Sequence, residues 1–134
     1  MVEGAGLPVC VFITGANVHE VTKVDSTLRA KVVYQKADGQ EIDENLCADA
    51  GFVGSAPAMQ AYGYIPHIRP RNVEADLIRN DPGFKPRRWV AEAFFSWLKR
   101  YRKVHVRYEK TLLSYWGLVT FACALICLNR SRTI

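Results

Sequence analysis

The sequence predicts an α/β fold, with helices on a sheet and an apolar helix near the C-terminal end. Short runs rich in β-branched and aromatic residues, typical of strands, alternate with segments whose apolar residues recur at helical spacing. Residues 111–128 follow without a single charge. The 134 residues are 49% hydrophobic, which suffices for one domain with a modest core and argues against disorder.

The chain is basic, with a formal net charge of +5, and the charge is unevenly placed. Residues 69–110 hold twelve Lys or Arg and five acids, a net of +7, whereas the remainder is −2. Aromatic residues are interleaved with these cations, and the combination suits a polyanion such as nucleic acid. The alternative is that the cations only keep a small protein soluble.

The four cysteines do not predict a metal site. Cys10 and Cys47 lie in strand-like runs, Cys123 and Cys127 are four apart in an apolar helix, and no C-x-x-C occurs. Neither a basic start nor an apolar core marks the first residues as a secretory signal. We expect buried thiols in a reducing cytosol.

The first third of the chain predicts a hairpin tip, a strand and a helix. Residues 1–6 are glycine-rich and read as the tip, and residues 7–14 form a β-branched run typical of a buried strand. Residues 20–33 have the spacing of an amphipathic helix. His19 and Glu20 are expected at its start, where an acid favours the helix dipole, and a metal pair is the alternative.

A short apolar run, residues 46–48, predicts a central strand buried on both faces, after a polar loop at 35–44. Asp49 ends this strand. Sheets of α/β proteins place ligand chemistry at the carboxyl ends of their strands, so Asp49 is a candidate functional acid. A turn-forming role is the alternative for an aspartate at this position.

Residues 56–62 predict a short helix with Gly63 as its C-terminal cap, followed by a strand at 64–68. Pro66 makes that strand an edge strand or a bulge. Residues 69–86 contain several prolines and read as a loop. Its basic residues Arg69 and Arg71 suit either a DNA clamp or a plain linker.

Residues 87–103 predict one long amphipathic helix. With Arg88 at zero, Lys99, Glu92, Lys103 and Ser96 fall between about 20° and 80°. The opposite side is an apolar stripe of Val90, Phe94, Trp97, Leu98, Tyr101 and Val104. Phe95 is a large apolar residue on the polar side and a candidate for stacking. Trp89 is a second candidate, although we expect it to pack.

The uncharged run 111–128 is at the lower edge of a membrane-spanning length and has basic residues on both sides. Ser114, Gly117, Thr120 and two alanines make it only moderately apolar. A core helix is the favoured interpretation, and a tail anchor in a membrane is the alternative.

The pattern Arg88, three residues, Glu92, six residues, Lys99 resembles the signature of insertion-sequence transposases of the DDE class. Lys85 stands where that family has a Tyr. Further resemblance, closest to the IS-five-like branch, lies in A-D-A-G-F at 48–52, R-Y-E-K at 107–110 and F-A-C-A-L-I-C-L at 121–128. The amino-terminal segment is similar to the family's D-G-x-G-x-P…G-A-N-x-H-D, with Glu3 and Glu20 in place of aspartates.

The resemblance implies a ribonuclease H-like fold, a mixed sheet with flanking helices, that is incomplete in residues 1–128 and followed by a basic tail at 129–134. It also implies that Asp49 and Glu92 are two catalytic acids of a two-metal Mg or Mn site. Matching residues would bind DNA: Arg88, Lys99, Arg69, Arg71, Lys103 and Phe95. No residue matches the family's first catalytic aspartate, so the metal site is expected to be incomplete.

The expected function is therefore that of a transposase fragment, which binds DNA but is inactive alone in Mg-dependent strand cleavage and transfer. Its expected partners are DNA (element ends and target), an upstream-frame product or full-length transposase, and a second copy of itself. Its expected location is the cytoplasm, with the nucleoid. The alternatives are a non-catalytic DNA-binding remnant or inhibitor and a small tail-anchored membrane protein.

Overall fold

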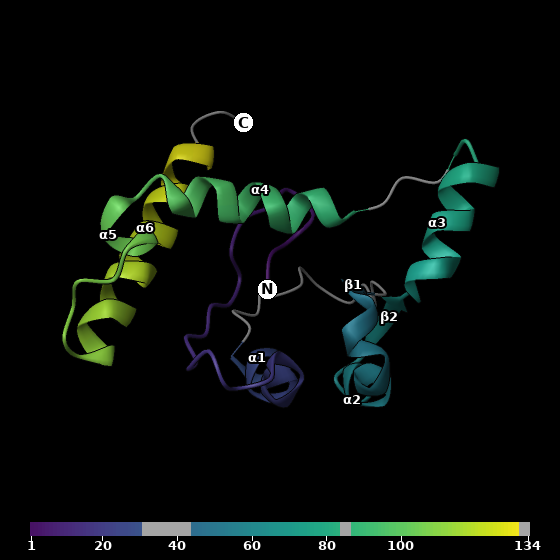
Figure 1. The fold of residues 1–134 in the computed structure, drawn as a ribbon, viewed down its shortest axis with the longest axis horizontal. Coiled ribbons are helices and arrows are strands. Elements are labelled where there is room, and N and C mark those ends of the chain that lie inside the picture. The colour runs from purple at the N-terminus through teal and green to yellow at the C-terminus, as the bar shows by residue number, and fades with distance from the viewer. Residues whose placement is uncertain (31–43, 84–86, 132–134) are drawn as a thin grey trace, which may run out of the picture. The chain divides into compact units, whose positions relative to one another are not determined.

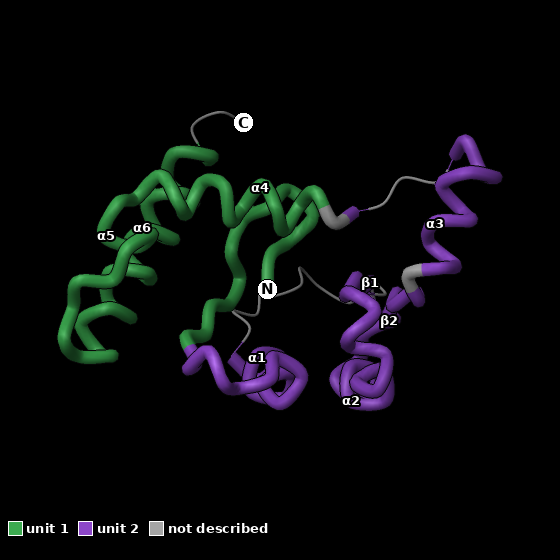
Figure 2. Tube along the Cα trace, viewed as in Figure 1, with its two compact units in different colours: residues 1–13, 88–134 green, residues 14–87 purple. Residues whose placement is uncertain are grey.

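A computed structural model describes residues 1–30, 44–83 and 87–131. The chain divides into two compact units (Figure 2). Unit 1 combines residues 1–13 with residues 88–134, and unit 2 comprises residues 14–87. Figure 1 labels their elements. The predicted loop at 35–44 and the predicted end of the first helix at 31–33 fall outside the described residues, except for Glu44.

Unit 1 begins with the hairpin tip that the sequence predicts. The amide of Glu3 donates to the carbonyl of Leu7 at 2.9 Å, and the amide of Gly6 donates to the carbonyl of Glu3 at 2.9 Å. Gly6 has a φ of 86°, the left-handed conformation that a three-residue hairpin connection needs at its last position. The ring of Trp97 would lie 3.2 Å from a Cβ at this position, so a glycine also allows that close approach.

The strand predicted at residues 7–14 is wrong. Within the described residues, pairing in this run is limited to one antiparallel bridge between Val2 and Pro8. Pro8 has no amide hydrogen to donate, and the run has no adjacent described strand to complete a ladder. Its apolar residues are used in packing instead: Cys10 is buried, and Val11 and Ile13 lie against the core of unit 1.

The single helix predicted over 87–103 is broken in two. Helix α4 spans Arg88–Lys99 and helix α5 spans Arg102–His105. The amides of Arg100 and Tyr101 bond three residues back, to Trp97 and Leu98, and Tyr101 is extended with ψ 98°. A continuous helix would stack the like charges of Lys99 and Lys103 four residues apart. The break also lets Val104 reach the core, where it is 9% exposed.

Helix α6, Leu112–Ser131, packs one side against α4 and α5. The buried core comprises Phe94, Val104, Val119, Ala122, Cys123 and Ile126. The core-helix interpretation therefore holds for that side, although its partners are helices and the amino-terminal segment rather than a sheet. By length and composition α6 could also cross a membrane, a criterion that core helices of soluble proteins meet as well.

Unit 2 contains a two-stranded parallel sheet in the described residues. Strand β1 spans Glu44–Ala48 and pairs with β2, Tyr64–Ile68, so that Leu46 faces Pro66 and Ala48 faces Ile68. Both predicted strands are confirmed, and Pro66 lies in an edge strand of this pair. The prediction that β1 is buried on both faces is wrong. Alternate residues are exposed, because α2 packs against β2.

The exposed residues of this sheet include a thiol that was expected to be buried. Cys47 is exposed, whereas Cys10 and Cys123 are buried and Cys127 is half-buried. Beside Cys47, the Nε2 atom of His67 and the Oδ1 atom of Asn45 lie 2.6 Å apart. Three of the four thiols thus lie in unit 1, and the accessible one is in unit 2.

The first two α-helices of unit 2 agree with the predicted helix start at residue 20 and the predicted cap at Gly63. A 3-10 turn, Glu20–Lys23, leads into α1, Val24–Arg29, and His19 caps the turn by accepting from the amide of Val21 at 3.4 Å. His19 and Glu20 are therefore helix-start residues, as expected. A second 3-10 turn, Ala50–Ser55, precedes α2, Ala56–Ala61. Gly63 follows α2 with a φ of 80°, as predicted for its cap.

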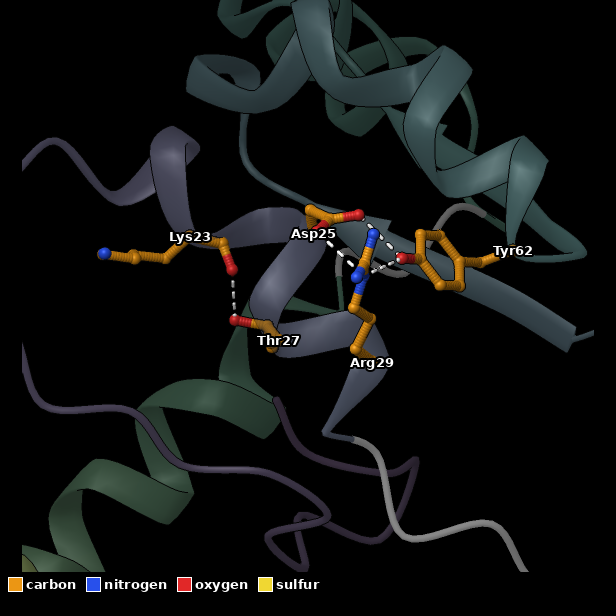
Figure 3. Close-up of polar contacts among 5 residues, drawn as sticks. All are labelled: Lys23, Asp25, Thr27, Arg29 and Tyr62. Atoms are coloured by element: carbon orange, nitrogen blue, oxygen red, sulfur yellow. Dashed lines mark hydrogen bonds and ion pairs between the residues drawn. The ribbon is translucent and has the colours of Figure 1, made fainter.

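A polar triad joins α1 to the end of α2 (Figure 3). The hydroxyl of Tyr62 donates to Asp25 Oδ1 at 2.7 Å and accepts from Arg29 Nε at 2.8 Å. Arg29 and Asp25 are also paired at 3.0 Å. The hydrogen bond to Tyr62 and the charge of Asp25 raise the pKa of Arg29.

Residues 71–80, predicted as part of a loop, form helix α3, Arg71–Asn80. Pro70 is its N-cap and accepts the first helical hydrogen bond, from the amide of Glu74 at 3.1 Å. The helix itself contains neither Gly nor Pro, so the prolines mark its ends and not a loop. A turn follows, in which Asp81 Oδ1 accepts from the amide of Gly83 at 2.9 Å.

Candidate functional site

The polar side of α4 carries the candidate acid of unit 1. Glu92, Ser96 and Lys99 are exposed, as the helical spacing predicts. On the opposite side Val90 and Phe94 are buried, and Trp97 and Leu98 are half-buried. Burial of the apolar stripe fixes the rotation of the helix about its axis. Glu92 therefore points to solvent because the opposite side of α4 is packed.

Two aromatic side chains stand on the exposed part of α4. Phe95 is 55% exposed and Trp89 is 60% exposed. The expectation that Trp89 packs is therefore wrong, because its place about 100° from Arg88 lies outside the buried stripe. The ring of Phe95 lies 5.5 Å from that of Phe94, tilted by 54°, so a buried ring supports the exposed one.

The candidate acid of unit 2 lies at the carboxyl end of the parallel pair. Asp49 directly follows β1, and its carbonyl accepts from the amide of Phe52 at 2.9 Å as the 3-10 turn begins. Because Ala48 pairs with Ile68, Arg69 leaves β2 at the same edge as Asp49. Both residues are exposed. An acid and a cation therefore share the edge of the sheet where ligand chemistry is usually placed.

The structure groups the other predicted residues by unit. In unit 1, Arg88 is the first residue of α4, and Lys99 is the last. Lys103 does not share their helix, because the break at Tyr101 places it in α5. In unit 2, Arg71 is not in a loop but begins α3.

The donor chemistry suits a hard divalent cation, although each unit supplies one candidate ligand. Asp49 and Glu92 are exposed carboxylates, the oxygen donors that Mg²⁺ prefers. Across residues 1–30, 44–83 and 87–131, no three His, Cys, Asp or Glu residues are grouped as a metal site. Two carboxylates are a partial ligand set for a pair of metal ions.

The prediction of one helix through Lys103 concealed an exposed basic segment. Arg100, Arg102, Arg107 and Lys110 are all exposed, and Tyr108 is 74% exposed. The sequence does show this segment as a cluster of Lys and Arg in residues 99–110. A single continuous helix would place these residues on different sides of the helix.

Comparison with known proteins gives the family. The family model described as the transposase DDE domain matches residues 1–127. The chain belongs to the DDE transposase family. This agrees with the signature read from Arg88, Glu92 and Lys99, and the family generally depends on divalent metal ions.

Two curated relatives of this chain come from insertion sequences. A Burkholderia cepacia protein assigned as the transposase for insertion sequence element IS402 is 27% identical over 134 residues, which cover 97% of this chain and 61% of the relative. A Brucella ovis protein assigned to element IS6501 is 53% identical over 38 residues, or 28% of this chain and 29% of the relative. The chain thus spans less than two thirds of the length of either relative. No solved structure gives a significant match.

Proposed function

We propose that this insertion-sequence transposase chain binds DNA and supplies two acids, Asp49 and Glu92, for metal-dependent DNA strand cleavage and transfer. The fold proposed for the complete catalytic domain is ribonuclease H-like, with the IS-five-like branch as its nearest group. The family match over residues 1–127 is the observation that carries the proposal. The exposure of both acids, each at the place its motif implies, supports it.

In this proposal Asp49 and Glu92 hold the Mg²⁺ or Mn²⁺ ions. When bound, a pair of such ions activates the attacking oxygen and stabilises the leaving oxygen of an in-line phosphoryl displacement. The protein's own part is to keep both carboxylates accessible. The outward rotation of α4 does this for Glu92, and the end of β1 does it for Asp49.

The cations have a separate role in the proposal. Lys99 on the polar side of α4 and Arg69 beside Asp49 are exposed and suited to phosphate oxygens. We propose the same role for Arg88, Arg71 and Lys103. Phe95 offers an accessible ring on which a base can stack. These contacts position DNA without reading its sequence, so binding should weaken steeply with salt.

Asp49 and Glu92 account for two catalytic acids, and no residue is matched to the family's first catalytic aspartate. We therefore propose that the isolated 134 residues bind DNA but do not cleave it, and that cleavage needs the third acid. A longer transposase chain is the partner that could provide it. Mg²⁺-dependent nicking of duplex DNA by the purified 134 residues would contradict this part of the proposal.

The test is a titration with Mn²⁺, in which electron paramagnetic resonance measures the concentration of unbound ion. We expect Asp49→Asn and Glu92→Gln each to weaken Mn²⁺ binding about ten-fold or more, since a metal site loses affinity when a ligand becomes neutral. Glu20→Gln is the matched control, an exposed acid at a helix start. Equal binding by all variants would reject the metal site, and duplex binding that persists would then leave a non-catalytic DNA-binding protein.

A further inference from the structure

The net charge of the chain is concentrated in twelve consecutive residues, 99–110, here called the basic strip. The strip holds six of the eighteen Lys and Arg residues and one of the thirteen acids. The rest of the chain carries twelve cations and twelve acids, so the formal net charge of +5 is that of the strip.

The fold turns every cation of the strip outward. The exposed cations are Lys99, Arg100, Arg102, Lys103, Arg107 and Lys110. The residues directed inward are Val104, which is buried, and Tyr101 and Glu109, which are half-buried. The Oε2 atom of Glu109 is itself buried.

The cations of the strip can be compared with a paired arginine in unit 2. Among the described residues, no carboxylate pairs with any cation of the strip, whereas Arg29 in unit 2 is paired with Asp25 at 3.0 Å. Six unpaired cations in twelve residues repel one another, and that repulsion is relieved when a polyanion binds. A face that only needs to be solvated would not require this concentration.

The strip is held in place by α6. The hydroxyl of Tyr115 donates to the carbonyl of Val104 at 2.7 Å. The guanidinium carbon of Arg107 lies 5.3 Å from the centroid of the same ring, and Arg107 Nε donates to the carbonyl of Glu109 at 3.1 Å. In Figure 1 the chain passes from the end of α4 through α5 and on to the start of α6. The cations are thus presented by an ordered backbone, which lowers the entropy lost on binding.

We propose that the basic strip is a second DNA-binding surface of this transposase, one that holds the phosphate backbone of duplex DNA and continues from Lys99 at the end of α4. The inference rests on the proposed DNA binding and adds Arg100, Arg102, Arg107 and Lys110 to it. A row of exposed Lys and Arg residues suits phosphates at regular spacing and does not require a particular sequence. It positions the duplex, while α4 presents the acid.

The test compares two double substitutions that remove the same charge. Arg102→Gln with Lys110→Gln changes the strip, and Lys23→Gln with Arg79→Gln changes unit 2. Binding of a fluorescent random-sequence duplex is measured by anisotropy in salt from about 50 to 200 mM. We expect the strip variant to lower affinity about ten-fold or more and to reduce the slope of log K against log salt by about two, and the control variant to change affinity less than about two-fold.

Each outcome has a distinct meaning. Equal losses of affinity for duplex DNA in both variants would overturn the proposal that the strip binds DNA, because net charge alone would then explain binding. Normal binding by the strip variant combined with loss in Phe95→Ala would overturn it too, while leaving the DNA binding of α4 intact. No duplex binding by the unaltered chain would reject the proposed function together with the strip, as would binding to phosphatidylserine vesicles in place of DNA. Unchanged Mn²⁺ binding by the strip variant would support a separate surface.

Discussion

Two adjacent phenylalanines of α4 allow the orientation of this helix to be tested directly. Phe94 is 4% exposed and lies in the core of unit 1, whereas Phe95 is 55% exposed. Replacing a buried Phe with Ala removes its packing and leaves a cavity, at about 3–5 kcal/mol of unfolding free energy. The same change at Phe95 should cost about 0.5 kcal/mol or less.

Urea unfolding followed by tryptophan fluorescence measures this difference, because the chain's three Trp residues, Trp89, Trp97 and Trp116, all lie in unit 1. With a slope of about 1.5 kcal/mol per molar urea, Phe94→Ala should lower the unfolding midpoint by about 2–3 M, and Phe95→Ala should hardly move it. Binding to single-stranded DNA should show the reverse order, with Phe95→Ala losing about 1–3 kcal/mol. Equal stability losses would refute the assigned rotation of α4, and with it the exposure of Glu92.

Further predictions concern the thiols and the polar triad. Burial raises the pKa of Cys123 to about 11. At pH 8 a maleimide should therefore modify the exposed Cys47 in the native protein, whereas Cys123 should react only after unfolding. Mass spectrometry after proteolysis identifies the modified thiols. Because this folded pKa lies above the ordinary value of 9.0, the buried neutral thiol contributes stability below pH 9 that is lost as the pH rises through 11. The free energy of unfolding, measured by tryptophan fluorescence, should fall by about 2–3 kcal/mol over that pH range. A free energy of unfolding that does not change with pH there would contradict the burial of Cys123. Tyr62→Phe removes the bridge between Asp25 and Arg29 but should cost less than about 1 kcal/mol, since all three groups are exposed; hydrogen exchange of the α1 amides would reveal a larger role.

Sequence periodicity located the buried stripe of α4 because seventeen residues with a strong apolar repeat allow one rotation of a helix. It could not locate the break at Tyr101, because the break depends on α6, which is distant in sequence and receives Val104 in its core. Local propensity favours continuing the helix there, and tertiary packing overrides it.

The misassigned segments have two different causes. Residues 7–14 have the composition of a strand, but a strand also needs a neighbour, and composition carries no information about which elements are adjacent. Helix α3 differs from the predicted loop because a proline is common both in loops and directly before a helix, and Pro70 marks the start of a helix. The strand ends at Ala48 and Ile68 are predictable, since each is followed by polar or turn-forming residues.

The central claim is that Asp49 and Glu92 share a pair of metal ions. Spin labels at Asp49→Cys and Glu92→Cys, with accessible Cys47 and half-buried Cys127 replaced by Ser and Ala, give the separation of these positions by double electron–electron resonance. Because carboxylates that share metal ions about 3.5–4 Å apart lie side by side, the predicted result is one narrow distribution centred below about 20 Å. A distribution centred beyond about 30 Å would place the acids in separate sites and contradict the account.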